Sequence, residues 1–327
     1  MKRIAVTGSA GQIAYSFLFR AAHGDLFSQK EEVALYLCDI PGNEKVMEGV
    51  VMELEDCAFP LLKELRFGTD PFEMFADTDL ALLIGAKPRG PGMERADLLM
   101  DNGKIFIEQG RALNEVADPD VKVVVVGNPC NTNCLIAMHH APRVPRKNFH
   151  AMMRLDQNRA IAQLAQKTRA AVDTVTCMTI WGNHSTTQVP DYNNVRIKGQ
   201  KVEDLIQDRH WLQNEFVGKV QKRGAEIIQA RGKSSAASAA SALADSVRSL
   251  YTPTPQGDWF TSAVCTDDNP YGIEKDLIFG FPCRSDGNGD YTIVPDVPLD
   301  FSTKEKIAVT QKELMAERTC IESLFHV

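Results

Sequence analysis

The stretch that most constrains the fold is residues 2–14, with the sequence KRIAVTGSAGQIA. A short apolar run is interrupted by Gly8 and Gly11, and a segment with helical periodicity follows, which predicts a strand, a glycine turn and a helix. The unpaired N–H groups and the positive dipole end of such a helix can hold a pyrophosphate. We expect Gly8 to permit the turn, Gly11 the approach of the phosphates, and Ala14 the packing of helix on strand. The spacing GxxGxxA therefore predicts a dinucleotide site, although a glycine turn after a strand is often only a turn.

A second apolar run, VALYLC at residues 33–38, ends at Asp39. An acidic residue at the carboxyl end of the second strand would hold the ribose 2′-hydroxyl of NAD and repel a 2′-phosphate. The alternative is an aspartate that only forms a turn or caps a helix.

Further apolar runs, DLALLI at 79–84 and VKVVVV at 121–126, are separated by a helical stretch at 98–116. Runs that are apolar on both faces and alternate with helices predict a parallel sheet covered on both sides. With 327 residues, the chain is long enough for two domains. We expect an α/β protein: a doubly wound parallel-sheet Rossmann domain at 1–153, closing with a short strand near 149–152, and a mixed α+β substrate domain at 154–327.

The second half shows mixed elements, which favours an active site in the cleft between two domains. The expected elements are a helix at 157–168, a strand at 175–181, a hairpin around Gly199-Gln200, two helices within 211–250, a strand around 278–283 and a last helix from Thr303.

Composition excludes some partners. Lys and Arg number 36 against 43 Asp and Glu, a formal net charge of -7, so no basic surface for nucleic acid is predicted. No apolar run approaches a membrane span, and Thr7, Gly8 and Gly11 break up the apolar core that a signal peptide needs. The eight cysteines have neither a CxxC pair nor a metal-ligand spacing, which favours reduced thiols in a cytosolic protein without a metal site.

Polar side chains follow several of the predicted strands. The loop KPRGPGMERADLL carries Arg89 and Arg95 among Gly and Pro residues, which predicts a lid that closes on an anion; the alternative is a solvated basic loop. Asn128 follows the run at 121–126 and could offer its amide to a substrate oxygen, although Asn-Pro is also a turn signal.

Asp156 and Arg159 lie one helical turn apart in RLDQNRA, and His184 follows a strand in WGNHS. A lone histidine is more often structural than catalytic. With a carboxylate to fix its tautomer and an arginine nearby, His184 is a candidate general acid/base.

The chain closely resembles the cytosolic-type malate dehydrogenases of the lactate/malate dehydrogenase superfamily over nearly its whole length. The resemblance rests on five segments in the same order and spacing: GSAGQIAYS, KPRGPGMERADLL, VVGNPCNTN, RLDQNRA and WGNHS. It implies an NAD-dependent enzyme that interconverts malate and oxaloacetate, a reaction of the tricarboxylic acid cycle. It also implies a homodimer in the cytoplasm.

The resemblance implies individual roles as well. His184 matches the proton acceptor, and Asp156 matches the carboxylate that orients it. Arg159 matches the arginine that grips the C1 carboxylate of the substrate. Arg89 matches the arginine that meets the second carboxylate, and Arg95 matches the lid arginine that polarises the carbonyl.

Asn128 matches the amide that orients the substrate. The positions that match cofactor contacts are Gly8, Ser9, Ala10, Gly11, Gln12, Ile13, Ala14, Asp39, Asn102, Gln109, Val126, Gly127 and Asn128. Two departures are Gln157, where a residue such as His is expected, and Gly90-Pro91 in the lid. The SSAAS run from Ser234 resembles a segment near the substrate, without indicating which serine approaches it.

Other classes fit less well. A short-chain reductase needs Tyr-xxx-Lys on a helix, and Tyr271–Lys275 follows Asn-Pro, contains a glycine and lies too late in the chain. A P-loop is suggested only by Gly232-Lys233-Ser234, and its required first glycine is replaced by Ile227. A lactate dehydrogenase-like enzyme for other 2-hydroxy acids and a non-catalytic NAD-binding regulator remain as alternatives.

Overall fold

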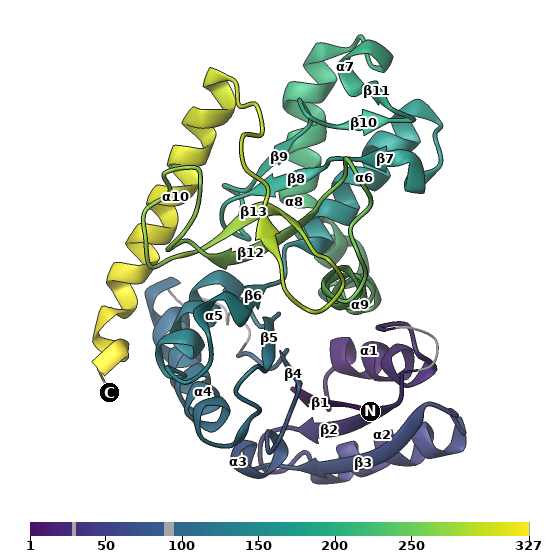
Figure 1. The fold of residues 1–327 in the computed structure, drawn as a ribbon, viewed down its shortest axis with the longest axis vertical. Coiled ribbons are helices and arrows are strands. Elements are labelled where there is room, and N and C mark those ends of the chain that lie inside the picture. The colour runs from purple at the N-terminus through teal and green to yellow at the C-terminus, as the bar shows by residue number, and fades with distance from the viewer. Residues whose placement is uncertain (28–30, 88–94, 327) are drawn as a thin grey trace.

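The computed structural model describes residues 1–27, 31–87 and 95–326, and it has two lobes (Figure 1). The strands of the first half are β1 (Lys2–Thr7), β2 (Val33–Cys38), β3 (Leu62–Gly68), β4 (Leu80–Leu83), β5 (Lys122–Val125) and β6 (Phe149–Ala151). Its helices are α1 (Gln12–His23), α2 (Glu44–Asp56), α3 (Pro71–Met74), α4 (Arg95–Val116), α5 (Cys130–His139) and the short η1 (Arg146–Asn148).

These six strands form a parallel sheet in the order β6-β5-β4-β1-β2-β3, which confirms the predicted doubly wound sheet. Alternate residues of β1 enter different cores. Ala5 packs with α4 and α5 on one face, whereas Ile4 and Val6 pack with α1 and α2 on the other. Because both faces are covered, strands such as β2 are buried along their whole length.

The second half contributes more strands and helices. The strands are β7 (Val175–Thr176), β8 (Thr179–Trp181), β9 (Val189–Asp191), β10 (Arg196–Ile197), β11 (Gln200–Lys201), β12 (Phe260–Cys265), β13 (Ile278–Arg284) and β14 (Thr292–Ile293). The helices are α6 (Arg154–Thr168), η2 (Val172–Thr174), α7 (Val202–Leu205), the π-helical η3 (Trp211–Phe216), α8 (Val217–Arg231), α9 (Ala237–Leu250), α10 (Phe301–Ile321) and η4 (Glu322–His326).

The short strand predicted near residues 149–152 is present as β6 and is the last strand of the parallel part, but it is not the edge of the sheet. The edge of β6 pairs antiparallel with β12, and β13 and β14 follow, so the sheet has nine strands. This pairing joins residues more than 100 positions apart, and no local pattern reveals it. The domain boundary at 153/154 remains a prediction.

Three further elements differ from expectation. The edge strand β3 was not predicted, because its residues are only partly buried and carry charges. Helix α5, which follows Asn128-Pro129, was not predicted. The run expected as one strand at 175–181 is divided into β7 and β8, which belong to separate sheets, because Cys177 has φ +60°.

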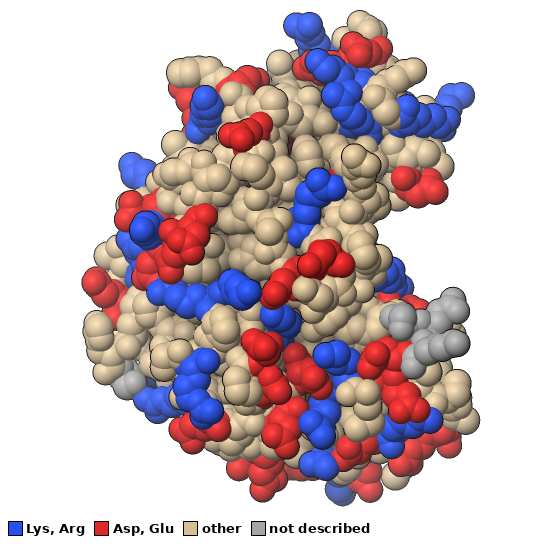
Figure 2. Space-filling view, in the orientation of Figure 1, with Lys and Arg blue, Asp and Glu red and all other residues tan. Residues whose placement is uncertain are grey.

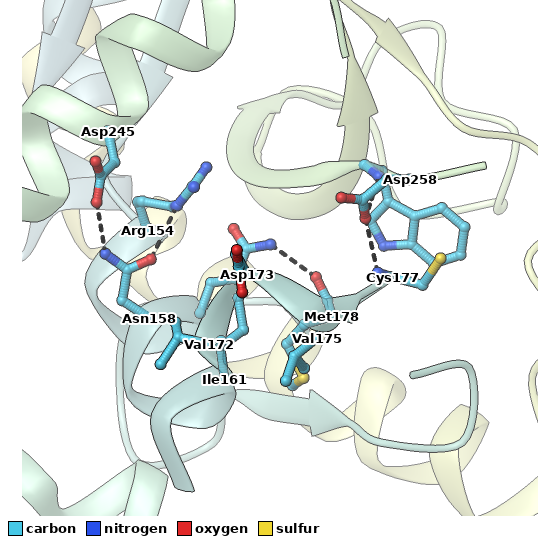
Figure 3. A pocket seen from close by; sticks show the side chains of 12 residues that line it. Arg154, Asn158, Ile161, Val172, Asp173, Val175, Cys177, Met178, Asp245 and Asp258 are labelled. Carbon is cyan, nitrogen blue, oxygen red and sulfur yellow. Dashed lines mark hydrogen bonds between the residues drawn. The ribbon is translucent and has the colours of Figure 1, made fainter. Parts of the chain in front are cut away.

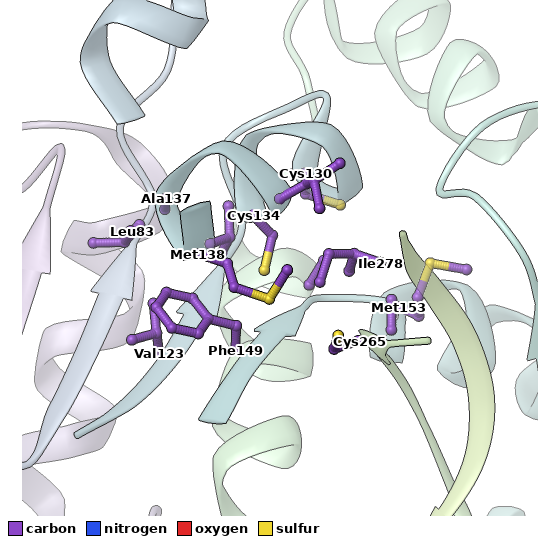
Figure 4. Close-up of a cluster of buried hydrophobic side chains, with 14 of the residues drawn as sticks. Leu83, Val123, Cys130, Cys134, Ala137, Met138, Phe149, Met153, Cys265 and Ile278 are labelled. Carbon is purple, nitrogen blue, oxygen red and sulfur yellow. The ribbon is translucent and has the colours of Figure 1, made fainter. Parts of the chain in front are cut away.

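The two lobes share a core. Figure 4 shows Met138 and Phe149 of the first half in one cluster with Cys265 and Ile278 of the second half. Acidic and basic side chains are interspersed over the visible face, without a continuous basic area (Figure 2). Among the described helices, none combines the length and apolar character that spanning a membrane requires.

Candidate active site

The glycine turn between β1 and α1 has the shape expected of a phosphate site. Gly8 has φ +67°, and a Cβ there would lie 2.7 Å from the Gly85 Cα. Gly11 is the N-cap of α1, without a side-chain cap, and the first turn of the helix has no acidic residue. The hydroxyl of Ser9 turns inward and donates to the Val6 carbonyl at 2.7 Å. The first turn of α1 therefore presents backbone N–H groups beside the glycine turn, which fits a dinucleotide pyrophosphate.

Asp39 lies beside this turn at the end of β2. Its Oδ2 accepts a hydrogen bond from the Ala10 N–H at 2.8 Å. Its Oδ1 accepts from the Ile40 N–H at 2.8 Å and from the Asn43 Nδ2 at 2.7 Å. These bonds hold a carboxylate next to the phosphate turn, where a ribose is expected. The sequence analysis did not identify Asn43, which precedes α2 by one residue.

The structure brings together His184, Asp156 and Arg159. Asp156 is fully buried in the first turn of α6, and its Oδ2 contacts His184 Nδ1 in a short hydrogen bond. Arg159, one turn later, donates from Nη1 to Asp156 Oδ1 at 3.2 Å. His184 and Arg159 keep 18% and 14% of their side chains exposed, so both can meet a ligand that the carboxylate cannot. The bond at Nδ1 leaves Nε2 of His184 as the nitrogen for proton exchange.

The electrostatics of this cluster favour a charged pair. Burial lowers the pKa of His184, but the adjacent Asp156 carboxylate overcomes this effect and raises the pKa above its ordinary value. Burial raises the pKa of Asp156, but the His184 and Arg159 charges and their hydrogen bonds hold it below its ordinary value. His184 therefore stays protonated to higher pH than a free imidazole does.

The loop that carries His184 is held from two sides. The buried Asn131 of α5 accepts from the His184 N–H at 3.0 Å through Oδ1, and its Nδ2 donates to the Ile278 carbonyl at 2.9 Å. On the other side, Glu313 of α10 accepts from the Ser185 hydroxyl at 2.5 Å and from Asn183 Nδ2 at 2.9 Å. These supports were not predicted from the sequence, because α5 and α10 are remote from His184 in the chain.

Gly182, two residues before His184, is expected to tolerate no side chain. It has φ +95°, and an added Cβ would overlap the Thr310 side chain. Gly182→Ala should lower the free energy of unfolding by about 3 kcal/mol or more, from backbone strain plus overpacking. Denaturant unfolding measures this change. Gly199→Ala is the matched control, because Gly199 also has positive φ but has open space around it, so only about 1 kcal/mol should be lost. Equal losses in the two variants would contradict the role given to Thr310.

The structure distinguishes among the serines of the SSAAS run. Ser235 accepts a hydrogen bond from Arg159 Nη2 at 3.3 Å, so it is the serine that reaches the cluster. The run leads into α9, which begins at Ala237 and buries Ala239, Ala240, Ala242 and Ala244.

The remaining expected contacts have different surroundings. Gly127 has no room for a side chain, because a Cβ would lie 2.8 Å from the Ala86 Cβ. The Leu83 carbonyl accepts hydrogen bonds from the Val126 N–H at 2.9 Å and from the Gly127 N–H at 3.1 Å. Asn128 is exposed. Asn102 is fully buried and holds the Lys87 backbone through bonds at 2.8 and 3.1 Å. Gln109 is also buried. Contacts of these residues with a cofactor remain predictions.

Two expected substrate residues cannot be placed. Arg89 lies outside the described residues, and so does the lid segment 88–94 that contains Gly90-Pro91. Arg95 begins α4, but its side chain is outside the described part of the chain.

The fold and the site define a class of protein: a two-lobed α/β dehydrogenase, with a dinucleotide turn at the carboxyl end of the interior strand β1 and a histidine–carboxylate–arginine cluster in the second half, bonded to α5 of the first. Two family models match the chain. Residues 2–150 match the NAD binding domain of lactate/malate dehydrogenase, and residues 153–325 match its alpha/beta C-terminal domain. The chain belongs to the lactate/malate dehydrogenase family. This confirms the predicted family, the fold class and the NAD-binding domain.

Relatives and solved structures agree with this assignment. A malate dehydrogenase of Protochlamydia amoebophila is 55% identical over 99% of this chain and 98% of its own length. A chloroplastic NADP malate dehydrogenase of Pisum sativum is also 55% identical, over 98% of this chain and 73% of its own. The crystal structure of malate dehydrogenase from Naegleria fowleri superposes with a TM-score of 0.95 at 42% identity, covering 99% of this chain and 98% of that one.

Proposed function

We propose that this chain is an NAD-dependent malate dehydrogenase that reversibly oxidises malate to oxaloacetate. The observation that carries the proposal is the cluster of His184, Asp156 and Arg159, which combines a proton carrier with a cation for a carboxylate. The full-length similarity to malate dehydrogenases supports the choice of substrate. The reaction is a step of the tricarboxylic acid cycle, and we propose that role for this chain.

The chain's own residues hold the substrate and move a proton. Arg159 binds the C1 carboxylate, with its guanidinium already oriented by Asp156 and Ser235. His184 Nε2 takes the hydroxyl proton when malate is oxidised, and it returns that proton when oxaloacetate is reduced. Asp156 stabilises the protonated imidazole, which keeps His184 ready for the reductive direction. Arg89, Arg95 and Asn128 are proposed to hold the second carboxylate, the carbonyl and the substrate's orientation.

NAD supplies the hydride chemistry when it is bound. Residues 8–14 would surround its pyrophosphate, with the N–H groups of the first turn of α1 as donors, and Asp39 would hold a ribose. The fit rests on the glycine turn, where a Cβ on Gly8 would collide with the Gly85 backbone and where α1 begins without a side-chain cap.

The chain should prefer NADH to NADPH, because Asp39 stands where a 2′-phosphate would lie. Juxtaposed like charges cost several kcal/mol, so kcat/KM should be at least about 100-fold higher with NADH. Asp39→Ser should narrow this ratio. Asp118→Ser is the matched control and should leave the ratio unchanged. Asp118 lies before the amino end of β5, whereas Asp39 lies at the carboxyl end of β2, and the two strands are parallel. Faster turnover with NADPH would overturn the role of Asp39 and place this chain with the NADP relatives.

The deciding assay follows NADH absorbance with oxaloacetate, pyruvate and 2-oxoglutarate. We expect rapid oxidation of NADH with oxaloacetate and not with the other two acids. Comparable use of pyruvate would instead favour a lactate dehydrogenase-like enzyme. A protein that binds NADH but is inert toward all three acids would be a non-catalytic regulator.

We also propose a homodimer, formed through a layer of helices in which α2, α1, α9 and α6 pack side by side. The outer face of α2 leaves Val46 and Met52 half exposed. The layer also contains a cavity of about 390 Å³, lined by Asn158 and Ile161 of α6, Asp245 of α9 and the segment around Cys177 (Figure 3). This cavity adjoins the face of α6 opposite Asp156 and Arg159, so it is separate from the proton-transfer cluster. Light scattering after gel filtration tests the subunit number; a monomer would contradict the proposal.

A cytoplasmic location is proposed as well. It rests on the family resemblance and on the scattered cysteines, which suit a reducing compartment. Immunoblots of fractionated cells test it.

A further inference from the structure

The Asp156 carboxylate has one more donor, from a residue outside the expected active-site set. Gln188 belongs to no motif recognised in the sequence. Its Nε2 donates to Asp156 Oδ1 at 3.3 Å. The same Nε2 donates to the Ser185 carbonyl at 3.0 Å. One amide group therefore joins Asp156 on α6 to the residue that follows His184.

The surroundings fix which end of the amide faces the carboxylate. Both neighbours of Nε2, a carboxylate and a carbonyl, are acceptors only, so the NH₂ group must point toward them. The opposite end, Oε1, is buried and has no hydrogen-bond partner among the described residues. Leaving a buried acceptor unpaired is unfavourable. The hydrogen bonds that hold this side chain are therefore those of its NH₂ group.

The main chain holds Gln188 in place. Its N–H donates to the Ser185 carbonyl at 3.3 Å, and its carbonyl accepts from Gln221 Nε2 of α8 at 2.8 Å. Only 3% of the residue is exposed, so Gln188 lies behind the carboxylate and out of reach of a substrate.

Arg159 and Gln188 share the same oxygen of Asp156 but differ in what else they serve. Arg159 is partly exposed and, under the proposed function, is recruited by the substrate carboxylate. Gln188 has no second task at the substrate. Arg159 therefore divides its donors between Asp156 and the substrate, whereas the Gln188 donor serves Oδ1 without contacting substrate.

We propose that Gln188 is a positioning residue, which keeps the Asp156 carboxylate aligned with His184 while Arg159 binds substrate. This inference rests on the proposed function. Two other charged or titratable groups face the pair of Asp156 and His184: Arg159 on α6 and the Cys130 thiol on α5. Glu313 and Glu317 on α10 are linked to the pair through Asn183 and Ser185. None of these is altered in the test.

The test compares two buried glutamines. Gln188→Met removes the donor at similar volume. Gln157→Met is the matched control, because Gln157 is equally buried and adjacent to Asp156 in the chain, and its side-chain partners in the described part of the chain are the backbones of Met178 and Thr261, not Asp156. We expect Gln188→Met to lower kcat for oxaloacetate about tenfold, with KM changed by less than about twofold, because no substrate contact is lost.

The pH profile separates positioning from a structural effect. With a loosened pair, Asp156 stabilises the imidazolium less, so the midpoint of oxaloacetate reduction should fall by about half a unit in Gln188→Met. Gln188→Asn, whose amide is one methylene shorter, should lower the midpoint as well. Gln157→Met should leave it unchanged, whatever stability it loses.

The proposal is overturned if Gln188→Met matches Gln157→Met in both kcat and midpoint. If Gln188→Met does not fold, Gln188→Asn decides: its shorter amide withdraws the donor from Asp156, so a lowered kcat and a lowered midpoint support the proposal, and wild-type values refute it. A wild-type protein without activity on oxaloacetate would refute the proposed function instead, so the two failures are distinguishable.

Discussion

Asp156→Asn should lower kcat for oxaloacetate reduction by about 10³- to 10⁴-fold. The amide can still occupy the space, but it cannot stabilise an imidazolium and it favours the wrong tautomer of His184. Replacing the equivalent carboxylate in a Ser-His-Asp triad costs about 10⁴-fold. Steady-state kinetics with NADH measures the loss. NADH binding, followed by fluorescence, should be unchanged, because Asp156 does not face the glycine turn.

Asp156→Asn should also move the pH midpoints of oxaloacetate reduction and malate oxidation to lower pH. In the wild-type protein the His184 pKa is raised, so oxaloacetate reduction is lost as pH rises through that pKa and malate oxidation is gained. Without the carboxylate, burial is unopposed and lowers the pKa, so both midpoints should move to lower pH.

Asp191→Asn is the control for a merely structural effect. Asp191 is a buried carboxylate of β9 that accepts hydrogen bonds from Trp181 and Asn194. Its replacement should cost stability and leave both midpoints in place. An Asp156→Asn enzyme that keeps more than about a tenth of the wild-type kcat would exclude Asp156 from proton transfer.

Local patterns were sufficient for most of the nucleotide-binding half. The glycine turn and the fully apolar run of β2 gave the correct strand, turn and helix, because both depend on short-range geometry. The addition of β12 to the edge of β6 was not predictable in this way. Pairing of that kind depends on how distant segments fit together, and periodicity does not report it.

The same distinction applies to the site. His184, Asp156 and Arg159 were recognisable because their residue types and spacing suit acid/base chemistry. Three residues were missed: Asn131, Gln188 and Glu313. Asn131 and Glu313 reach the cluster from α5 and α10, which are remote from His184 in the chain. Gln188 is close to His184 in the chain but belongs to no distinctive motif. Their chemistry is ordinary; only their position in the fold makes them relevant.

Oxaloacetate should be reduced at least about a thousandfold more efficiently than pyruvate, a difference of roughly 4 kcal/mol in transition-state binding. Among the described residues, Arg159 is the cation bonded within the His184 cluster, and one guanidinium pairs with one carboxylate. Oxaloacetate carries a second carboxylate, and Arg89 is the residue that we propose for it. Pyruvate would leave the Arg89 charge without a partner, which is costly in a closed site. Values of kcat/KM for the two acids measure the ratio.

Arg89→Gln should reduce this preference by improving pyruvate and impairing oxaloacetate, since the amide no longer penalises an uncharged methyl group. Arg143→Gln is the control, because Arg143 is an exposed arginine bonded to Asn114, away from the cluster, and should leave the ratio unchanged. If the Arg89 variant keeps the wild-type ratio, another group must recognise the second carboxylate. If the wild-type protein already uses both acids equally, the site does not select dicarboxylates at all, and the lactate dehydrogenase-like alternative becomes the better description of its chemistry.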